Sequence, residues 1–344
     1  MKLALIGFGG VGKAFLQLLE NKQNTLKNEN LNIEILYIFN SKGCLYMPNG
    51  IPIDDLSKHI DSGGTLGNYT QTLCHNITYD DMLKNDDVDT LIELTPTNKE
   101  TGEPGLTNIY KALFHGINVV TGNKGPILLK YHELSTLAHK NNVQLGIGCT
   151  TGGALPSINA GLMDLAGSDI HVIEGVLNGT TNHILKQMED HGLNYYEALK
   201  KAQKAGIVES DPSLDVEGWD TASKLLILTN VLCDQHQRLD DVIVEGITHL
   251  THDEIQMAKY ENKKYKLIGR AEKTTHDFIL HVKLEKIDQS HPFFNVDGKN
   301  KAVRYVSDTL GELTVIGGAS GVTPAAASIL RDIVNIHRGY RFTN

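Results

Sequence analysis

The chain has 344 residues and a formal net charge of −9 at pH 7. This length exceeds what one compact core usually holds and predicts two domains. The negative charge argues against nucleic acid or an anionic membrane as a partner, and no apolar run has the length needed to span a bilayer. The cysteines at positions 44, 74, 149 and 233 lack the spacing of a metal site or a disulfide framework, which predicts a reducing, cytoplasmic setting.

The N-terminus carries the first motif. A short apolar run is followed by Gly7-Phe8-Gly9-Gly10-Val11-Gly12 and then by a helical apolar pattern. This is the G-x-G-x-x-G dinucleotide fingerprint between a strand and a helix, in which the glycines allow a tight turn, close approach of the pyrophosphate and helix packing. The pyrophosphate is expected on the helix N-terminus. A secretory signal peptide is the disfavoured alternative, because Lys13 interrupts the apolar run and no small-residue cleavage site follows.

Strands and helices are predicted to alternate through the first half of the chain. Such alternation specifies an α/β fold with a doubly wound parallel sheet of the Rossmann type, whose ligands gather at the carboxyl ends of the strands. Thr95, Asn123 and Lys124 fall at such ends. Residues 40–80 read as irregular and are left unassigned. The predicted strands are 33–39, 89–94, 118–121 and 144–148, and the predicted helices are 106–115 and 131–141.

The second half predicts a mixed sheet with helices on one face, which makes a second, α+β domain. We expect residues 1–150 to form the dinucleotide-binding domain and residues 151–317 the substrate domain, joined at a glycine turn near 152–153. A further glycine turn containing Gly321 opens a last helix, which ends near His337 and completes the first domain with residues 318–344. The predicted strands are 171–177, 278–284 and 313–316, and the predicted helices are 181–191, 195–205 and 219–232.

An acidic run precedes and enters the helix predicted at 219–232. Asp220 and Lys224 are spaced i, i+4 and share one helix face. Glu209 and Asp215 lie just before them, so this stretch can hold an amino acid by its ammonium group and also move a proton. The alternative is an ordinary surface ion pair on a helix.

Two further segments offer site residues with a structural alternative. Lys124 follows a strand end, and Gly125 and Pro126 predict that it lies in a loop and points toward the nicotinamide; a solvated loop lysine is the alternative. Residues 178–183 link a strand to a helix. There Thr180 or Thr181 is the expected N-cap, while free N–H groups and hydroxyls of the same turn could bind a substrate carboxylate.

The motifs taken together resemble homoserine dehydrogenase in its short form, without a C-terminal regulatory domain. The resemblance covers nearly the whole chain and rests on the fingerprint and on segments 123–126, 152–157, 178–182, 209–212, 215–218 and 220–224. It implies interconversion of L-homoserine and L-aspartate 4-semialdehyde with a nicotinamide cofactor, in threonine, methionine and isoleucine biosynthesis.

The resemblance also assigns roles to residues. It implies that Lys224 and Lys124 serve proton transfer, that Asp220 supports Lys224, and that Glu209, Asp215, Gly179 and Thr180 contact the substrate. It implies a homodimer built through the sheet of the second domain. Many members carry a glutamate where this chain has Gly148, so the monovalent-cation site of the family is in doubt and no metal is expected here. A dehydrogenase of another amino acid and a non-catalytic dinucleotide sensor are the rival functions.

The end of the second predicted strand bears on cofactor choice. It reads Asn40-Ser41-Lys42 and lacks the carboxylate that accepts a hydrogen bond from the ribose 2′-hydroxyl of NAD. Ser41 and Lys42 suit a 2′-phosphate, which predicts a preference for NADP(H) with NAD(H) also possible; a pocket that accepts either cofactor is the alternative. The expected cofactor-binding residues are residues 7–12, Asn40, Ser41, Lys42, Thr95, Lys124 and Gly321.

Overall fold

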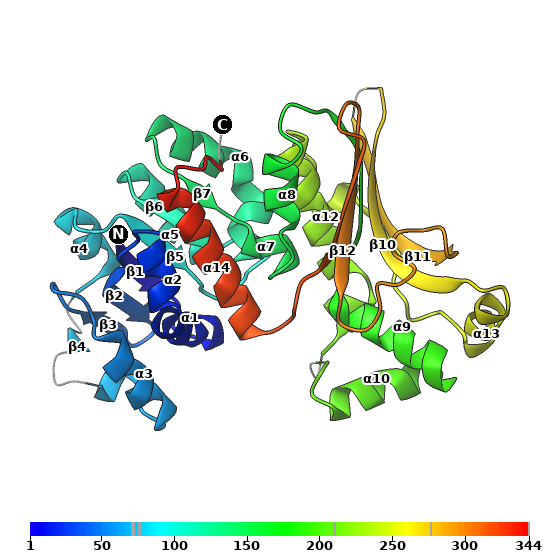
Figure 1. Ribbon diagram of the computed structural model, residues 1–344, viewed down its shortest axis with the longest axis horizontal. Coiled ribbons are helices and arrows are strands. Elements are labelled where there is room, and N and C mark those ends of the chain that lie inside the picture. Colours follow the sequence, from blue (N-terminus) through cyan, green and yellow to red (C-terminus); the bar gives the residue numbers. More distant parts are fainter. Residues whose placement is uncertain (70–72, 75–76, 209–210, 276, 343–344) are drawn as a thin grey trace. The chain divides into compact units, whose positions relative to one another are not determined.

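The computed structural model describes residues 1–69, 73–74, 77–208, 211–275 and 277–342. The chain divides into two compact units (Figure 1). The first unit is Met1–Thr150 together with Gly321–Asn344, and the second is Thr151–Ser320. No helix in the described ranges combines the length and apolarity that a membrane span requires.

The first unit is built on a seven-stranded sheet in the order β4-β3-β2-β1-β5-β6-β7. Five neighbouring strands, β2, β1, β5, β6 and β7, are parallel, whereas β3 and β4 form an antiparallel edge. Ile6 pairs with both Phe39 and Glu93, and Glu93 pairs with Thr121, so four parallel strands end at one level. The strands are β1 (Lys2–Ile6), β2 (Glu34–Asn40), β3 (Gly43–Tyr46), β4 (Leu73–Cys74), β5 (Thr90–Glu93), β6 (Asn118–Thr121) and β7 (Leu145–Gly146).

Helices cover this sheet as the doubly wound prediction requires. Leu3 and Leu5 of β1 share a buried core with Phe15 of α1 and Ile329 of α14, and α1 and α14 lie side by side (Figure 1). Because strand residues alternate between faces, Ala4 between them faces the other side, where α5 and α6 pack together. The helices of this unit are α1 (Gly10–Asn21), α2 (Gln23–Asn28), α3 (Ile53–Asp61), α4 (Tyr79–Asn85), α5 (Gly105–Phe114), α6 (Lys124–Lys140) and α14 (Val322–His337); the short α7 (Cys149–Gly152) spans the junction.

Residues 40–80, which the sequence analysis left unassigned, contain regular structure in their described part. Ser41 and Lys42 form a two-residue turn between β2 and β3, and α3 and α4 follow. The start of α4 could have been predicted from the sequence, because Thr78 and Asp81 have the spacing of a capping box, which they form in the structure. The hairpin lacks the Asn-Gly type of turn that marks such loops in a sequence.

The second unit contains a six-stranded sheet in the order β13-β12-β8-β10-β11-β9, antiparallel except for the β11–β9 pair. Its strands are β8 (Ile170–Val176), β9 (Ile243–Val244), β10 (Lys264–Lys273), β11 (Phe278–Ile287), β12 (Lys301–Ser307) and β13 (Glu312–Gly317). Its helices are α8 (Ser157–Met163), α9 (Gly179–His191), α10 (Tyr195–Lys204), α11 (Ser213–Val216), α12 (Trp219–Leu232) and α13 (His252–Tyr260).

Helix α12 packs on this sheet where two glycines face each other across β8 and β10. Gly175 pairs with Gly269, and a Cβ at Gly269 would lie 3.1 Å from Thr221 Cγ2 of α12. The adjacent strand residues therefore face away from α12. On that face the fully buried Glu174 of β8 pairs with Arg270 of β10 at 2.7 Å and with Arg304 of β12 at 3.1 Å.

Candidate functional site

The turn from β1 into α1 has the geometry of a dinucleotide-binding fingerprint. Gly7 has φ +96°, and a Cβ there would lie 2.4 Å from the carbonyl of Leu94, so no larger residue fits. Gly12 packs α1 tightly, since a Cβ there would lie 2.9 Å from the Gly7 oxygen. A Cβ at Gly9 would meet no described atom within 4 Å. Gly9 thus borders open space at the start of α1, where helix N–H groups favour an anion.

The turn containing Gly321 lies beside this fingerprint. Gly321 is the N-cap of α14 with φ +118°, and a Cβ at Gly10 would lie 3.1 Å from Val322 Cγ1. The structure therefore brings the N-termini of α1 and α14 together, although Gly10 and Val322 are 312 positions apart in the chain. Two helix N-termini at one place add to the favourable field for a pyrophosphate, so the residues here fit the dinucleotide.

The β2–β3 turn stands at the same edge of the sheet. The Gly7 N–H donates to Phe39 O at 3.1 Å, which ties the fingerprint to the end of β2. The Lys42 N–H donates to Asn40 Oδ1 at 2.8 Å, and the side chains of Ser41 and Lys42 are exposed. Both side chains are therefore accessible to a ligand at this edge.

A buried carboxyl, which the sequence analysis did not single out, organises the ends of β5 and β6. Glu93 is 0% exposed. It accepts hydrogen bonds from the N–H and hydroxyl of Thr95 and from Thr121 Oγ1 at 2.9 Å. Asn123 Nδ2 donates to Thr95 Oγ1 at 3.3 Å. Burial raises the pKa of Glu93, against the lowering effect of the bonds from Thr95, Thr121 and Asn123.

Lys124 is not in a loop, contrary to the prediction. It is the first residue of α6, and Asn123 is the N-cap whose Oδ1 accepts from the Gly125 N–H at 3.1 Å. Pro126 is tolerated because the first turn of a helix has no intrahelical partner for its N–H. The backbone leaves helical geometry at Lys130, and the predicted start at residue 131 corresponds to the second part of α6.

The second unit contains a charged cluster around Lys224. Lys224 Nζ donates to Asp220 Oδ2 at 2.6 Å and to Leu177 O at 2.8 Å. The side chains of Lys224 and Asp220 are only 14% and 11% exposed, so this is not the solvated surface pair of the alternative interpretation. An ammonium has three N–H groups, and the two contacts with described residues use two of them.

Asn178 joins Asp215 to this cluster. Its Nδ2 donates to Asp215 Oδ1 at 2.6 Å and to Asp220 Oδ2 at 2.8 Å. Its Oδ1 accepts from the Thr181 N–H at 2.9 Å, so Asn178 is the N-cap of α9 and the predicted cap at Thr180 or Thr181 is wrong. Asn178 belongs to segment 178–182, which contributes to the family resemblance, but the sequence gives no sign that its side-chain amide contacts two carboxylates.

The other predicted substrate residues lie around the start of α9, apart from Glu209, which is outside the described residues. Gly179 and Thr180 are the first two residues of α9 and are half-buried. Gly179 packs closely, because a Cβ there would lie 3.0 Å from Lys299 O. Asp215 lies in the short α11.

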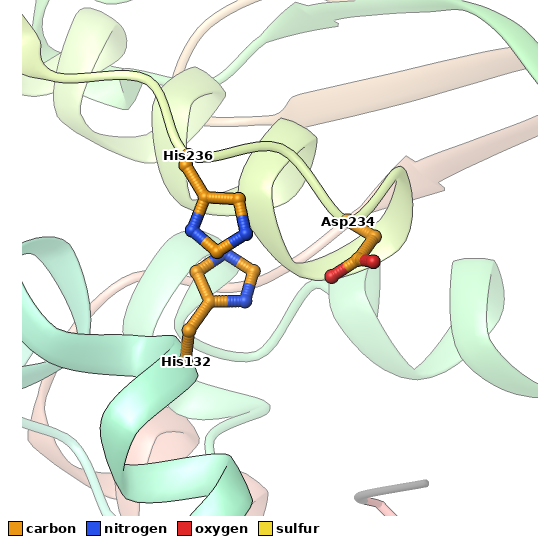
Figure 2. A group of neighbouring side chains, drawn as sticks. All are labelled: His132, Asp234 and His236. Atoms are coloured by element: carbon orange, nitrogen blue, oxygen red, sulfur yellow. The ribbon is translucent and has the colours of Figure 1, made fainter.

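Two features bear on metal binding. The first is Gly148, which has no side chain to bind a cation where many family members carry a glutamate; its N–H donates to Asp332 Oδ2 of α14 at 2.8 Å. Figure 2 shows His132 on α6 of the first unit, and Asp234 and His236 on the segment after α12 in the second. Each unit alone contributes at most two of these three ligands, fewer than the three or four protein ligands of a zinc site. We assign no metal to them.

Comparison with known proteins decides the family. Residues 7–147 match the model described as "Homoserine dehydrogenase, NAD binding domain", and residues 156–334 match the model described as "Homoserine dehydrogenase". The chain belongs to the homoserine dehydrogenase family. Homoserine dehydrogenases bind a nicotinamide dinucleotide, as the fingerprint predicts, and the fold class and family expected from the sequence are confirmed.

Several relatives match over nearly the full length of this chain. A homoserine dehydrogenase from Methanocaldococcus jannaschii is 34% identical over 337 residues, which cover 98% of each chain. An NAD(+)-dependent homoserine dehydrogenase from Pseudomonas canavaninivorans is 35% identical over 340 residues, 98% of this chain and 96% of that protein. The crystal structure of a homoserine dehydrogenase from Thiobacillus denitrificans superposes with a TM-score of 0.82 at 26% identity and covers 98% of this chain and 73% of that one.

Proposed function

We propose that this chain interconverts L-homoserine and L-aspartate 4-semialdehyde, a step in threonine, methionine and isoleucine biosynthesis. Membership of the family makes it an NAD(P)-dependent oxidoreductase that acts on a CH–OH group. The observation that carries the residue assignments is the buried Lys224–Asp220 pair, which Asn178 at the start of α9 links to Asp215 of α11. This arrangement combines a proton donor with groups that suit an amino acid.

The amino-acid end of the substrate is assigned to the start of α9 and to the acids before α12. Asp215 uses Oδ1 for Asn178, and its other oxygen is available in this assignment for the substrate ammonium group. Glu209 is assigned to the same ammonium by its charge. The N–H groups of Gly179 and Thr180 in the first turn of α9, with the Thr180 hydroxyl, suit the substrate carboxylate.

Lys224 is assigned to proton transfer. When bound, the nicotinamide dinucleotide supplies or accepts the hydride. In reduction, Lys224 Nζ gives a proton to the oxygen of the semialdehyde, and in oxidation the neutral amine takes the hydroxyl proton of homoserine. Asp220 Oδ2 and Leu177 O hold Nζ from two sides, which fixes its direction and reduces the reorganisation needed during the reaction.

Lys124 is assigned as a second cation for the same step. It opens α6, at the level where β5 and β6 end, and the carboxyl edge of such a sheet is where ligands bind. A cation near the reacting oxygen stabilises developing alkoxide charge. We assign both lysines to the proton-transfer machinery and leave the order of their action open.

The cofactor is proposed to be NADP(H) in preference to NAD(H). Support comes from the exposed Ser41 and Lys42 on the β2–β3 turn, where a hydroxyl and a cation can contact a 2′-phosphate. The Pseudomonas canavaninivorans relative is named as NAD(+)-dependent, so the family includes the other choice. Residues 7–12, Asn40, Thr95, Lys124 and Gly321 complete the proposed cofactor site.

We also propose a homodimer through the sheet of the second unit. The face turned away from α12 carries Arg270 and Arg304, whose Nε atoms are buried without a hydrogen-bond partner among the described residues. Ile279 on β11, next to β10, and Ile316 on β13, next to β12, are both more than half exposed. Light scattering after size exclusion tests this: a monomer at micromolar concentration contradicts the dimer.

A turnover assay tests the proposed activity. The purified chain is mixed with homoserine and NADP⁺ or NAD⁺, and formation of reduced nicotinamide is followed; serine and threonine serve as alternative hydroxy amino acids. We expect cofactor-dependent oxidation of homoserine and much slower reaction with the other two. Absence of turnover with homoserine would point to a dinucleotide sensor, and faster turnover with another amino acid to a different dehydrogenase.

A further inference from the structure

Asn178 makes more contacts than a helix cap needs. The capping function uses only Oδ1, which accepts from the Thr181 N–H. Ser, Thr or Asp caps a helix about as well as Asn does. The contacts of Nδ2 with Asp215 and Asp220, at 2.6 and 2.8 Å, are additional, and among the preferred capping side chains only Asn also has N–H donors.

Other helices of the chain show caps without this addition. Asn194 caps α10 by accepting from the Glu197 N–H at 3.0 Å, and Thr251 caps α13 through the Glu254 N–H at 3.3 Å. Both belong to capping boxes that satisfy backbone groups of their own helix. Asn178 instead reaches α11 and α12, 37 and 42 residues further along the chain.

The amide also solves an electrostatic problem. Asp215 and Asp220 both lie within hydrogen-bond reach of one nitrogen, and two carboxylates at such a distance repel each other. The Asn178 NH₂ group supplies one N–H to each of them. Asp220 Oδ2 receives this N–H and also Lys224 Nζ, so the position of Asn178 helps to set the position of the ammonium. Asn178 is itself only 5% exposed, which fixes its rotamer by packing.

We propose that Asn178 is a positioning residue for the reaction, which couples the carboxylate for the substrate ammonium, Asp215, to the Lys224–Asp220 pair. This inference rests on the proposed function of these three residues. It adds that substrate binding and proton transfer are aligned by one side chain, which touches neither the reacting oxygen nor the cofactor.

Asn178→Ser tests the proposal, because serine keeps the cap and removes both N–H donors. We expect kcat to fall and the KM for homoserine to rise, with a combined loss in kcat/KM of about 10- to 100-fold, the scale of a displacement near 1 Å. The KM for the cofactor should stay within about twofold. The matched control is Asn194→Ser, which alters an N-cap asparagine of the adjacent α10 and should leave all kinetic constants unchanged.

Asn178→Asp is the second variant. It has nearly the same shape and also keeps the cap, but it replaces the donors by an acceptor beside two carboxylates. We expect a loss at least as large as that of Asn178→Ser. The melting temperature of Asn178→Ser should stay close to that of Asn194→Ser, whereas that of Asn178→Asp should be lower, because a third carboxylate repels Asp215 and Asp220.

The outcomes separate the inference from the proposed function. An active wild type with Asn178→Ser unchanged in both kcat and homoserine KM would overturn the inference alone. For Asn178→Ser, a large drop in melting temperature together with a matching rise in the cofactor KM would also overturn it, because that pattern belongs to a purely structural cap. A wild type that does not oxidise homoserine would overturn the proposed function itself.

Discussion

The two proposed sites are built in opposite ways. In the first unit, the fingerprint is formed mainly by backbone at the start of α1. Gly7 and Gly12 have no room for a Cβ, and Gly9 leaves space for a ligand. In the second unit, the site is formed by side chains, since Lys224, Asp220, Asp215 and Asn178 make a connected network. A backbone site is damaged by adding atoms, whereas a side-chain site is damaged by removing them.

The largest expected effect concerns removal of a charge in the second unit. Lys224→Ala should lower turnover by about 10²- to 10⁴-fold, the usual contribution of a proton-transfer group, while the dissociation constant of the cofactor stays unchanged. Steady-state kinetics and a cofactor titration measure the two quantities. Lys186→Ala is the matched control, because Lys186 also pairs with an aspartate at i+4, Asp190, at 2.9 Å. Near-normal turnover of Lys224→Ala would remove Lys224 from the mechanism.

The next effect concerns the addition of one methyl group in the first unit. Gly9→Ala should keep the melting temperature, because its Cβ meets no described atom within 4 Å. We expect the cofactor KM to rise by about 10- to 100-fold, which corresponds to an overpacking cost of roughly 1–3 kcal/mol.

Gly7→Ala is the companion variant and should behave differently. Its positive φ and its contact with Leu94 should lower the stability of the fold itself by at least about 1–3 kcal/mol. Thermal unfolding of both variants measures the contrast. A destabilised Gly9→Ala with normal cofactor binding would contradict the distinction between a ligand-facing and a protein-facing glycine.

Glu93 tests the comparison from the other side, because it is a buried ionisable side chain in the first unit, whose fingerprint is formed mainly by backbone. Burial raises its folded pKa above the ordinary value of 4.5. A group with a raised folded pKa contributes stability below its unfolded pKa, and that stability is lost as the pH rises through the folded pKa. The melting temperature of the wild type, relative to Glu93→Gln, should therefore fall as the pH rises above about 4.5. The exposed Glu133→Gln on α6 serves as control, and a difference that grows with pH would contradict the prediction.

The smallest effect concerns the β2–β3 turn. We expect kcat/KM to be higher with NADP(H) than with NAD(H), and Lys42→Glu to reverse this order, because a carboxylate accepts from the ribose 2′-hydroxyl and repels a 2′-phosphate. A lysine contacts a phosphate as a point charge without the two-point geometry of arginine, so the preference should be partial. Side-by-side kinetics with both cofactors measure it. A wild type that prefers NAD would show that this turn does not select for the phosphate.

Local patterns were sufficient for much of the fold. The predicted helix 219–232 and strand 118–121 agree with α12 and β6 residue for residue. Other elements were missed: β10 and β12, which flank β8, were not assigned, although Val303, Tyr305 and Val306 of β12 are typical strand residues. The start of α6 was misplaced because a Gly-Pro pair reads as a loop, although proline is favourable in a first helical turn.

The sequence alone determined the family, the dinucleotide fingerprint and the i, i+4 spacing of Asp220 and Lys224, since each is read from short segments whose own residues are close together in the chain. The fold decided what spacing cannot express. The hydrogen bonds of Glu93 with Thr121 depend on the pairing of β5 with β6. The bridge from Asn178 to Asp215 and Asp220 depends on the packing of α9 against α11 and of α11 against α12. A hydrogen bond needs two atoms within about 3 Å, and for residues tens of positions apart only the folded backbone sets that distance.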